Sequence, residues 1–318
     1  MGTGELAALA AAALWACSSL FYGRTKLSAW QLNFGKNLLA SIILYAHLGV
    51  ATQLAGRPMF SADRNSWLLL AVSSVIGILI GDTFYFRSLQ ILGPRRALIV
   101  SMTSPLFGAV AGWIALSETL SLLSVTGILL TLTGVAAVVS ERGASSEIPG
   151  HFPASLTRGV VMGLLAALCN ACGGTFSRLG TFGSSALSAS GCDPLEATVI
   201  RVGLASASSI TLAILTGQLL STARKSFEPT ALKTYLPAVV CGPWLGIWMS
   251  QIAYKNSGVA IVLTLTCTTP LFVMPMLRIS SGYRITPRAI SGALLALAGV
   301  YLTVAGAEAA TSLAEPPR

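Results

Sequence analysis

Long apolar stretches separated by short polar ones dominate the pattern of this chain. A helix that crosses the hydrocarbon core of a bilayer needs about 20 mostly apolar residues. Ten stretches of the sequence come close to this requirement, so we predict an all-α integral membrane protein with ten transmembrane helices. They cover residues 5–22, 29–49, 67–89, 97–116, 121–140, 159–176, 195–217, 235–254, 259–277 and 287–306.

The longest polar break between these helices is rich in glycine and proline, which favour a loop. It separates five predicted helices from another five. The predicted organisation is a first five-helix repeat, an inter-repeat linker, a second five-helix repeat and a polar C-terminal tail, over residues 1–140, 141–158, 159–306 and 307–318.

The two halves align with each other at a constant offset over four helices, which indicates an internal duplication. The first helices align at a different offset, with Arg24 on Arg178, so the second half carries a short insertion around Gly180 to Cys192. Three glycine pairs, Gly77 with Gly81, Gly242 with Gly246 and Gly108 with Gly112, also have the spacing that lets helices approach closely. The aligned pairs are Lys36 and Arg201, Gly77 and Gly242, Gly81 and Gly246, Gly93 and Gly258, Pro105 and Pro270, Gly127 and Gly292, and Gly134 and Gly299.

An odd number of helices per half requires the two repeats to insert with opposite orientation. The loop charges agree, because the loop at 87–96 carries three arginines and its aligned partner carries only Lys255. Most Lys and Arg lie in the loops after the odd-numbered helices, and the positive-inside rule then places both termini outside. Pro105 and Pro270 each follow a hydroxyl-rich tetrad, which predicts a broken helix at a substrate site or hinge, or a simple packing kink.

Composition supports a membrane protein. Of the 318 residues, 54% are hydrophobic and 10% are charged, against about 25% charged in soluble domains. These proportions exclude a soluble globular protein, a disordered chain and a small disulfide framework. The net charge of +9 fits loops that face the cytoplasmic leaflet better than nucleic acid. We expect a multi-pass protein of the inner or plasma membrane with no nucleic-acid partner.

Lys36 and Asp82 are the first candidates for a functional site, because a charge at membrane depth is costly. Both lie about seven residues inside antiparallel helices, at the same depth and from the same side. We therefore predict an ion pair that faces a central cavity. Its role is either purely stabilising or linked to protons or substrate.

Arg201 occupies the equivalent depth from the opposite face, but the position aligned with Asp82 is Ile247. Four partners are open to it: helix-end carbonyls, Glu196, water, or an anionic group on a substrate. A guanidinium suits a carboxylate or a phosphate. A snorkelling or structural arginine is the alternative.

Other candidates are polar or aromatic residues on helices that face the predicted cavity. Interface anchoring of the tryptophans and interhelical hydrogen bonds of the amides are the alternatives. Glu118 is expected only to stabilise the start of the helix at 121–140. The additional candidates for substrate binding are Asn33, Asn37, Trp15, Tyr85, Asn170, Trp244, Trp248 and Gln251.

No catalytic, metal or cofactor site is predicted. Cys169 and Cys172 form a C-x-x-C, but no second Cys or His pair completes a metal site. Asp82 lacks the Gly-x-Gly-Asp context of an intramembrane aspartyl protease, and His47 and His151 lie far apart. An intramembrane enzyme, a channel and a non-transporting scaffold remain alternatives to a carrier.

Several short motifs are spread over the two halves of the chain. They are Leu14-Trp15, the two cations Lys36 and Arg201, and residues 88–93, 104–107, 116–120, 253–258 and 269–272, with Gly127, Gly134, Gly292 and Gly299. With these motifs the chain resembles the drug/metabolite transporter superfamily in its ten-helix, EamA-domain form. It departs from the pattern at Lys36, where arginine is usual, and at Tyr283, which aligns with Glu118. The resemblance implies a secondary transporter, an exporter or facilitator of small polar metabolites such as amino acids, working by alternating access. Proton coupling is possible, and we expect a monomer or homodimer.

Overall fold

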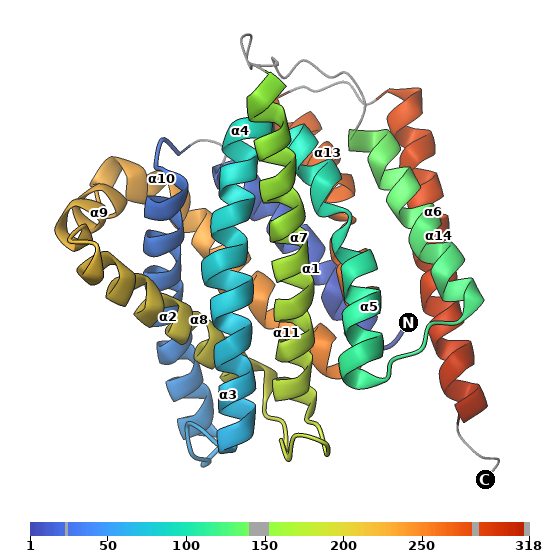
Figure 1. Cartoon of the computed structure of the whole chain (residues 1–318), viewed down its shortest axis with the longest axis horizontal. Helices are drawn as coiled ribbons and strands as arrows, with labels where there is room; N and C mark the ends of the chain where they lie inside the picture. The colour runs from blue at the N-terminus through green and yellow to red at the C-terminus, as the bar shows by residue number, and fades with distance from the viewer. Residues whose placement is uncertain (23–24, 140–152, 282–285, 315–318) are drawn as a thin grey trace.

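The computed structural model describes residues 1–22, 25–139, 153–281 and 286–314. These residues form a bundle of helices, and their extended pairing is confined to one isolated bridge between Ser184 and Ala189 (Figure 1). The elements are α1 (Thr3–Tyr22), α2 (Ala29–Leu54), α3 (Arg64–Ser73), η1 (Ser74–Gly81), α4 (Asp82–Ser101), α5 (Ser104–Leu116), α6 (Leu122–Val139), α7 (Pro153–Phe182), α8 (Pro194–Leu215), α9 (Leu219–Ser226), α10 (Pro229–Val239), η2 (Val240–Gly246), α11 (Ile247–Asn256), α12 (Val259–Thr266), α13 (Thr269–Ser281) and α14 (Pro287–Ala314).

Eight helical runs of the described residues are long and apolar enough to cross a membrane. Two shorter apolar helices, α5 and α6, correspond to the predicted segments 97–116 and 121–140. α5 has 13 residues and is therefore about 20 Å long at 1.5 Å per residue, which is less than the hydrocarbon thickness. The described residues thus bear out an all-helical membrane architecture with eight candidate spans, and the predicted count of ten transmembrane helices stays a prediction.

The predicted helix breaks lie directly before the two aligned prolines. Residues 102–103 separate α4 from α5, whose second residue is Pro105, and residues 267–268 separate α12 from α13, whose second residue is Pro270. In both breaks a threonine hydroxyl donates to a backbone carbonyl three residues earlier. The threonine hydroxyls therefore supply hydrogen bonds to backbone carbonyls near each break. This is the compensation expected where Ser and Thr precede a proline.

Two π-helical segments occupy aligned positions in the repeats. η1 contains Gly77 and Gly81, and η2 contains Gly242 and Gly246, the glycine pairs that match in sequence. Short π-helical segments are rare and occur frequently at functional sites. The spacing of these glycines predicts close packing but does not indicate the wider helix that surrounds them.

The first helix of each repeat packs against the opposite repeat. α1 lies on α10, η2 and α11, and α7 lies on α3, η1 and α4. Trp15 contacts Gly246, and Cys169 contacts Gly81 in the equivalent way. Trp15 and Cys169 align at the offset of the first helices, so the two contacts are related by the internal duplication.

The helices α6 and α14 form a closely packed pair at one edge of the bundle (Figure 1). A β-carbon added at Gly127, Gly134 or Gly299 would lie closer than 3.0 Å to backbone atoms of the facing helix. Hydroxyl groups reinforce the contact, because Ser121 donates to the carbonyl of Gly306 at 2.9 Å. The aligned glycines of α6 and α14 thus bring two backbones together.

We expect Gly127→Ala to lower the stability of the protein by about 1–3 kcal/mol, because the added methyl group forces α6 and α14 apart. The measurement is the free energy of unfolding in detergent. Gly49→Ala is the matched control, since a β-carbon at Gly49 meets nothing within 4 Å and alanine favours a helix. Equal stability of the two variants would contradict the prediction.

The predicted insertion begins later than expected, because residues 180–182 form the end of α7. The loop that follows is fixed to Asp63, the N-cap of α3. Asp63 Oδ1 accepts hydrogen bonds from the backbone and hydroxyl of Ser190 at 3.0 and 2.7 Å. Hydrogen bonds from Ser66 and Ser190 hold the pKa of Asp63 well below its usual range. The loop is therefore an ordered connection between α7 and α8.

Candidate functional site

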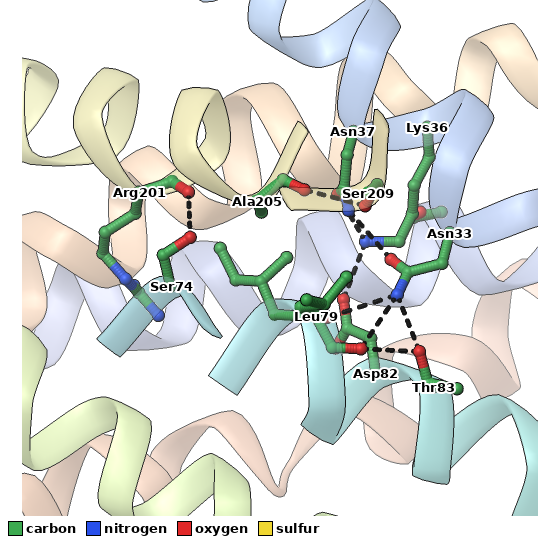
Figure 2. A network of polar contacts seen from close by, with 12 residues as sticks. Asn33, Lys36, Asn37, Ser74, Leu79, Asp82, Thr83, Arg201, Ala205 and Ser209 are labelled. Carbon is green, nitrogen blue, oxygen red and sulfur yellow. Dashed lines mark hydrogen bonds and ion pairs between the residues drawn. The ribbon is translucent and has the colours of Figure 1, made fainter. Parts of the chain in front are cut away.

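The predicted ion pair between Lys36 and Asp82 is present. Lys36 Nζ lies 2.7 Å from Asp82 Oδ2 and also donates to Asn37 Oδ1 at 3.0 Å (Figure 2). The Lys36 side chain is 1% exposed and that of Asp82 is 31% exposed. α2 supplies the lysine, and Asp82 is the first residue after η1. The ion pair therefore lies beside a π-helical segment, and the charge of Lys36 is neutralised by that of Asp82.

Asn33 connects this pair to the backbone of η1. Its amide nitrogen donates to the carbonyls of Ile78 and Leu79, each at 3.3 Å, and to Thr83 Oγ1 at 3.1 Å. Its amide oxygen accepts from Asn37 Nδ2 at 3.0 Å. Because a π-helix disturbs the regular pattern of backbone hydrogen bonds, a side-chain donor at these carbonyls helps to hold the segment in place.

Arg201 lies apart from the Lys36–Asp82 pair, on α8 (Figure 2). It is 7% exposed, and its Nη1 donates to Gln251 Oε1 at 3.0 Å. The same amide oxygen accepts from Ser177, and Gln251 Nε2 donates to Thr181 Oγ1 at 3.2 Å. Among the described residues, Arg201 Nε has no hydrogen-bond partner. Arg201 forms no ion pair with any carboxylate of the described chain.

Glu196, one of the four possible partners of Arg201, is occupied elsewhere. Its carboxylate accepts from the backbone nitrogens of Ser61 and Ala62, each at 2.7 Å, and from the Ser61 hydroxyl at 2.8 Å. The Arg201 charge therefore lies in a buried site with one neutral side-chain acceptor. A buried cation without a counter-ion is expensive, and an anion beside it restores the balance.

Two predicted tryptophans contact His47, which is not among the site residues predicted from the sequence. Trp244 Nε1 donates to His47 Nδ1 at 3.2 Å. The imidazole ring also stands edge-on to Trp248, with 4.9 Å between ring centroids and an interplanar angle of 82°. His47 follows Lys36 by a whole number of helical turns, so both side chains lie on one face of α2. The spacing of His47 from Lys36 is therefore the sequence signal that could have identified His47.

The other predicted residues are distributed around these groups. Trp15 covers η2 at Gly246, and the Tyr85 ring lies against Phe86 with 5.8 Å between centroids. Asn170 is exposed and donates to Ser104 Oγ at 3.4 Å. The structure thus joins Asn33, Lys36, Asn37 and Asp82 in one network and Arg201 with Gln251 in another, and leaves Asn170 outside both.

Glu118 has a different role from the predicted one. It accepts from the backbone nitrogen of Val259 at 2.9 Å, so it stabilises the start of α12 in the other repeat. Its Oε1 lies 2.5 Å from Arg178 Nε. Arg178 Nη1 donates to the carbonyls of Tyr254 and Ser257 at 2.6 and 2.7 Å. The sequence could not pair these residues, because Glu118, Arg178 and Val259 lie far apart along the chain.

No group of three or more His, Cys, Asp or Glu side chains in the described ranges is arranged to hold a metal ion. Cys169 and Cys172 are partly buried, free thiols on α7. The candidate residues of the site carry charged groups, amides and aromatic rings.

Comparison with known proteins identifies the family. The profile of the EamA-like transporter family matches residues 2–140 and 157–305. An uncharacterized transporter of Archaeoglobus fulgidus is 28% identical over 153 residues, which cover 48% of this chain and 53% of that protein, so the chain spans about half the length of this curated relative.

A solved crystal structure of a protein that is 18% identical in sequence shares the fold. It superposes with a TM-score of 0.70 over 96% of this chain and 98% of its own. The family profile covers both halves of the chain, and eight helical runs of the described residues are long and apolar enough to cross a bilayer. The protein is therefore a multi-pass membrane protein with two EamA domains, and it belongs to the EamA-like transporter family.

Proposed function

We propose that the protein is a secondary transporter, an exporter or facilitator of small polar metabolites such as amino acids, and that it works by alternating access. The observation that carries the proposal is the buried Arg201, whose guanidinium has one neutral side-chain acceptor and no carboxylate partner among the described residues. A substrate carboxylate or phosphate supplies the missing partner. Lys36, Asp82 and the amides of Asn33, Asn37 and Gln251 provide the polar surroundings.

The arrangement of the repeats supports movement of the two halves around this site. Lys36 and Arg201 are aligned residues on α2 and α8, which pack against each other. Each helix lies beside a π-helical segment of the bundle. In transporters built from inverted repeats, binding sites lie near the middle of the membrane at the interface of the repeats. We propose the same for this chain, with both termini outside the inner or plasma membrane and the domain boundaries given above.

We expect Arg201→Met to reduce transport about tenfold or more while the protein stays folded. A hydrogen bond to a charged group contributes about 1.5–3 kcal/mol, and methionine fills the space without leaving a buried charge. Gln251 Oε1 keeps its donor Ser177 in this variant. The measurement is uptake of labelled amino acids, sugars and nucleotides into proteoliposomes.

Arg224→Met is the matched control, because Arg224 is an exposed arginine on α9 and its loss leaves the buried site intact. Saturable uptake by the wild type and by Arg224→Met, lost in Arg201→Met, supports a carrier with Arg201 in its binding site. Full transport by Arg201→Met would remove Arg201 from that site. A folded wild type that moves no member of the panel favours a channel or scaffold.

A further inference from the structure

Cys17 and Cys241 are two thiols in direct contact that the proposed function does not use. Their Sγ atoms lie 3.4 Å apart, although 224 positions separate the two residues along the chain. Both are free, partly buried cysteines. Cys17 lies on α1 and Cys241 lies in η2, so the pair is found where the first helix of one repeat meets the π-helical segment of the other.

The backbones of α1 and η2 come close together at this point. A β-carbon added at Gly242, the neighbour of Cys241, would lie 2.6 Å from Ser18 Oγ. Ser18 is the neighbour of Cys17, and its hydroxyl donates to the carbonyl of Ala238 at 2.9 Å. The residues beside both thiols therefore hold the two helices against each other, which keeps the two sulfur atoms in contact.

A disulfide bond between the two cysteines requires only a small movement. The sulfur atoms of a disulfide are about 2.05 Å apart, so the two Sγ atoms have to approach by about 1.4 Å from their separation of 3.4 Å. Small rotations about the two Cα–Cβ bonds supply a movement of this size. The helices therefore do not need to separate or slide for the bond to form.

We propose that Cys17 and Cys241 are a redox-active pair, which a small disulfide compound oxidises to a disulfide bond between the two repeats. One protein thiol, as its thiolate, attacks a sulfur of the compound, which gives a mixed disulfide and releases one thiol of the compound. The second protein thiol attacks the protein sulfur of the mixed disulfide and releases the other thiol. Two protein thiols are oxidised, one small disulfide is reduced to two thiols, and the protons of the protein thiols go to the released sulfurs.

The bond fastens α1 covalently to η2. A disulfide constrains the unfolded chain, and the constraint grows with the length of the loop that it closes. The loop between Cys17 and Cys241 covers most of the chain. We therefore expect the oxidised protein to unfold in detergent at a higher temperature than the reduced protein.

The distribution of the cysteines along the chain allows a direct test of the bond. Of six cysteines, only Cys17 precedes the predicted inter-repeat linker. The others are Cys169, Cys172, Cys192, Cys241 and Cys267. A recognition site for a specific protease, inserted into residues 141–158 of the full chain, allows the two halves to be separated by cleavage. Within one molecule, only a disulfide that includes Cys17 then keeps the halves together on a denaturing gel without reductant.

The folded, purified protein is treated with dithiodipyridine at mildly alkaline pH, where more of each thiol is ionised. Remaining thiols are blocked with N-ethylmaleimide before cleavage and denaturation, so that the gel reads only bonds formed in the folded protein. We expect the halves of the wild type to stay linked and to separate when dithiothreitol is added. Each bond should release two molecules of thiopyridone.

Cys241→Ser removes one partner of the bond, so the halves of this variant should separate without reductant and its unfolding temperature should not respond to oxidation. Cys172→Ser is the matched control, because it removes another partly buried cysteine from the same half of the chain. This control should behave as the wild type does in both measurements.

Halves of the oxidised wild type that separate without reductant would overturn the proposal. A linkage that persists in Cys241→Ser, or an oxidised wild type that unfolds no later than the reduced protein, would do the same. None of these measurements uses a transport assay, and the proposal does not rest on the transport function. A protein that fails the transport experiment above but forms the bond therefore rejects only the proposed function.

Discussion

Asp82→Leu is expected to destabilise the protein by about 3–5 kcal/mol, the range for breaking a buried ion pair. The variant leaves the Lys36 ammonium, which is 1% exposed, with the amide oxygen of Asn37 and the ring of Phe86 as its remaining contacts. Lys36→Met should cost less, because Asp82 is 31% exposed and water can solvate part of its charge. The measurement is the free energy of unfolding in detergent.

The double variant Lys36→Met/Asp82→Leu separates a structural pair from a general loss of packing. Replacing both charges by apolar groups of similar volume is often neutral or stabilising, so the double variant should be more stable than Asp82→Leu alone. If the two single effects simply add, the two side chains do not interact and the ion pair contributes nothing to the fold.

Arg178→Ala is the second variant with a large expected effect, again about 3–5 kcal/mol. It removes the partner of Glu118 and the donor to the carbonyls of Tyr254 and Ser257. Arg178→Lys should not restore the loss, because an ammonium cannot reproduce the fork of a guanidinium that holds three acceptors. Thermal unfolding in detergent measures both.

Arg224→Ala is the matched control for this experiment as well, since exposed side chains without such contacts usually change stability by less than about 0.5 kcal/mol. A stability of Arg178→Ala close to that of the control would show that the contacts between the loop before α6, the end of α7 and the start of α12 are dispensable.

Periodicity and composition predicted the features that depend on local sequence. Apolar length located the candidate membrane helices, and the aligned prolines located the helix breaks. The depth of Lys36 and Asp82 in antiparallel helices was enough to predict their ion pair, because two helices adjacent along the chain fix the relative position of both residues.

Contacts between the repeats were not predictable in the same way. Glu118 stabilises α12 and Glu196 binds the segment before α3, although each was considered only for a nearer partner. The π-helical form of η1 and η2 also escaped prediction, because no residue pattern distinguishes it from an α-helix. The sequence spacing places His47 on the same face of α2 as Lys36, but the tryptophans that contact His47 come from the other half of the chain.

The exchange of first helices between the repeats has a consequence for the order of events during biosynthesis. The hydroxyl of Ser18 on α1 donates to the carbonyl of Ala238, and Ser257 donates to Glu5 near the start of the chain. At about 5–20 residues per second, α1 leaves the ribosome on the order of ten seconds or more before these partners are made. The first half is therefore inserted before it can complete its packing, and the nascent protein depends on the lipid and the insertion machinery to shield α1 until the last third of the chain arrives.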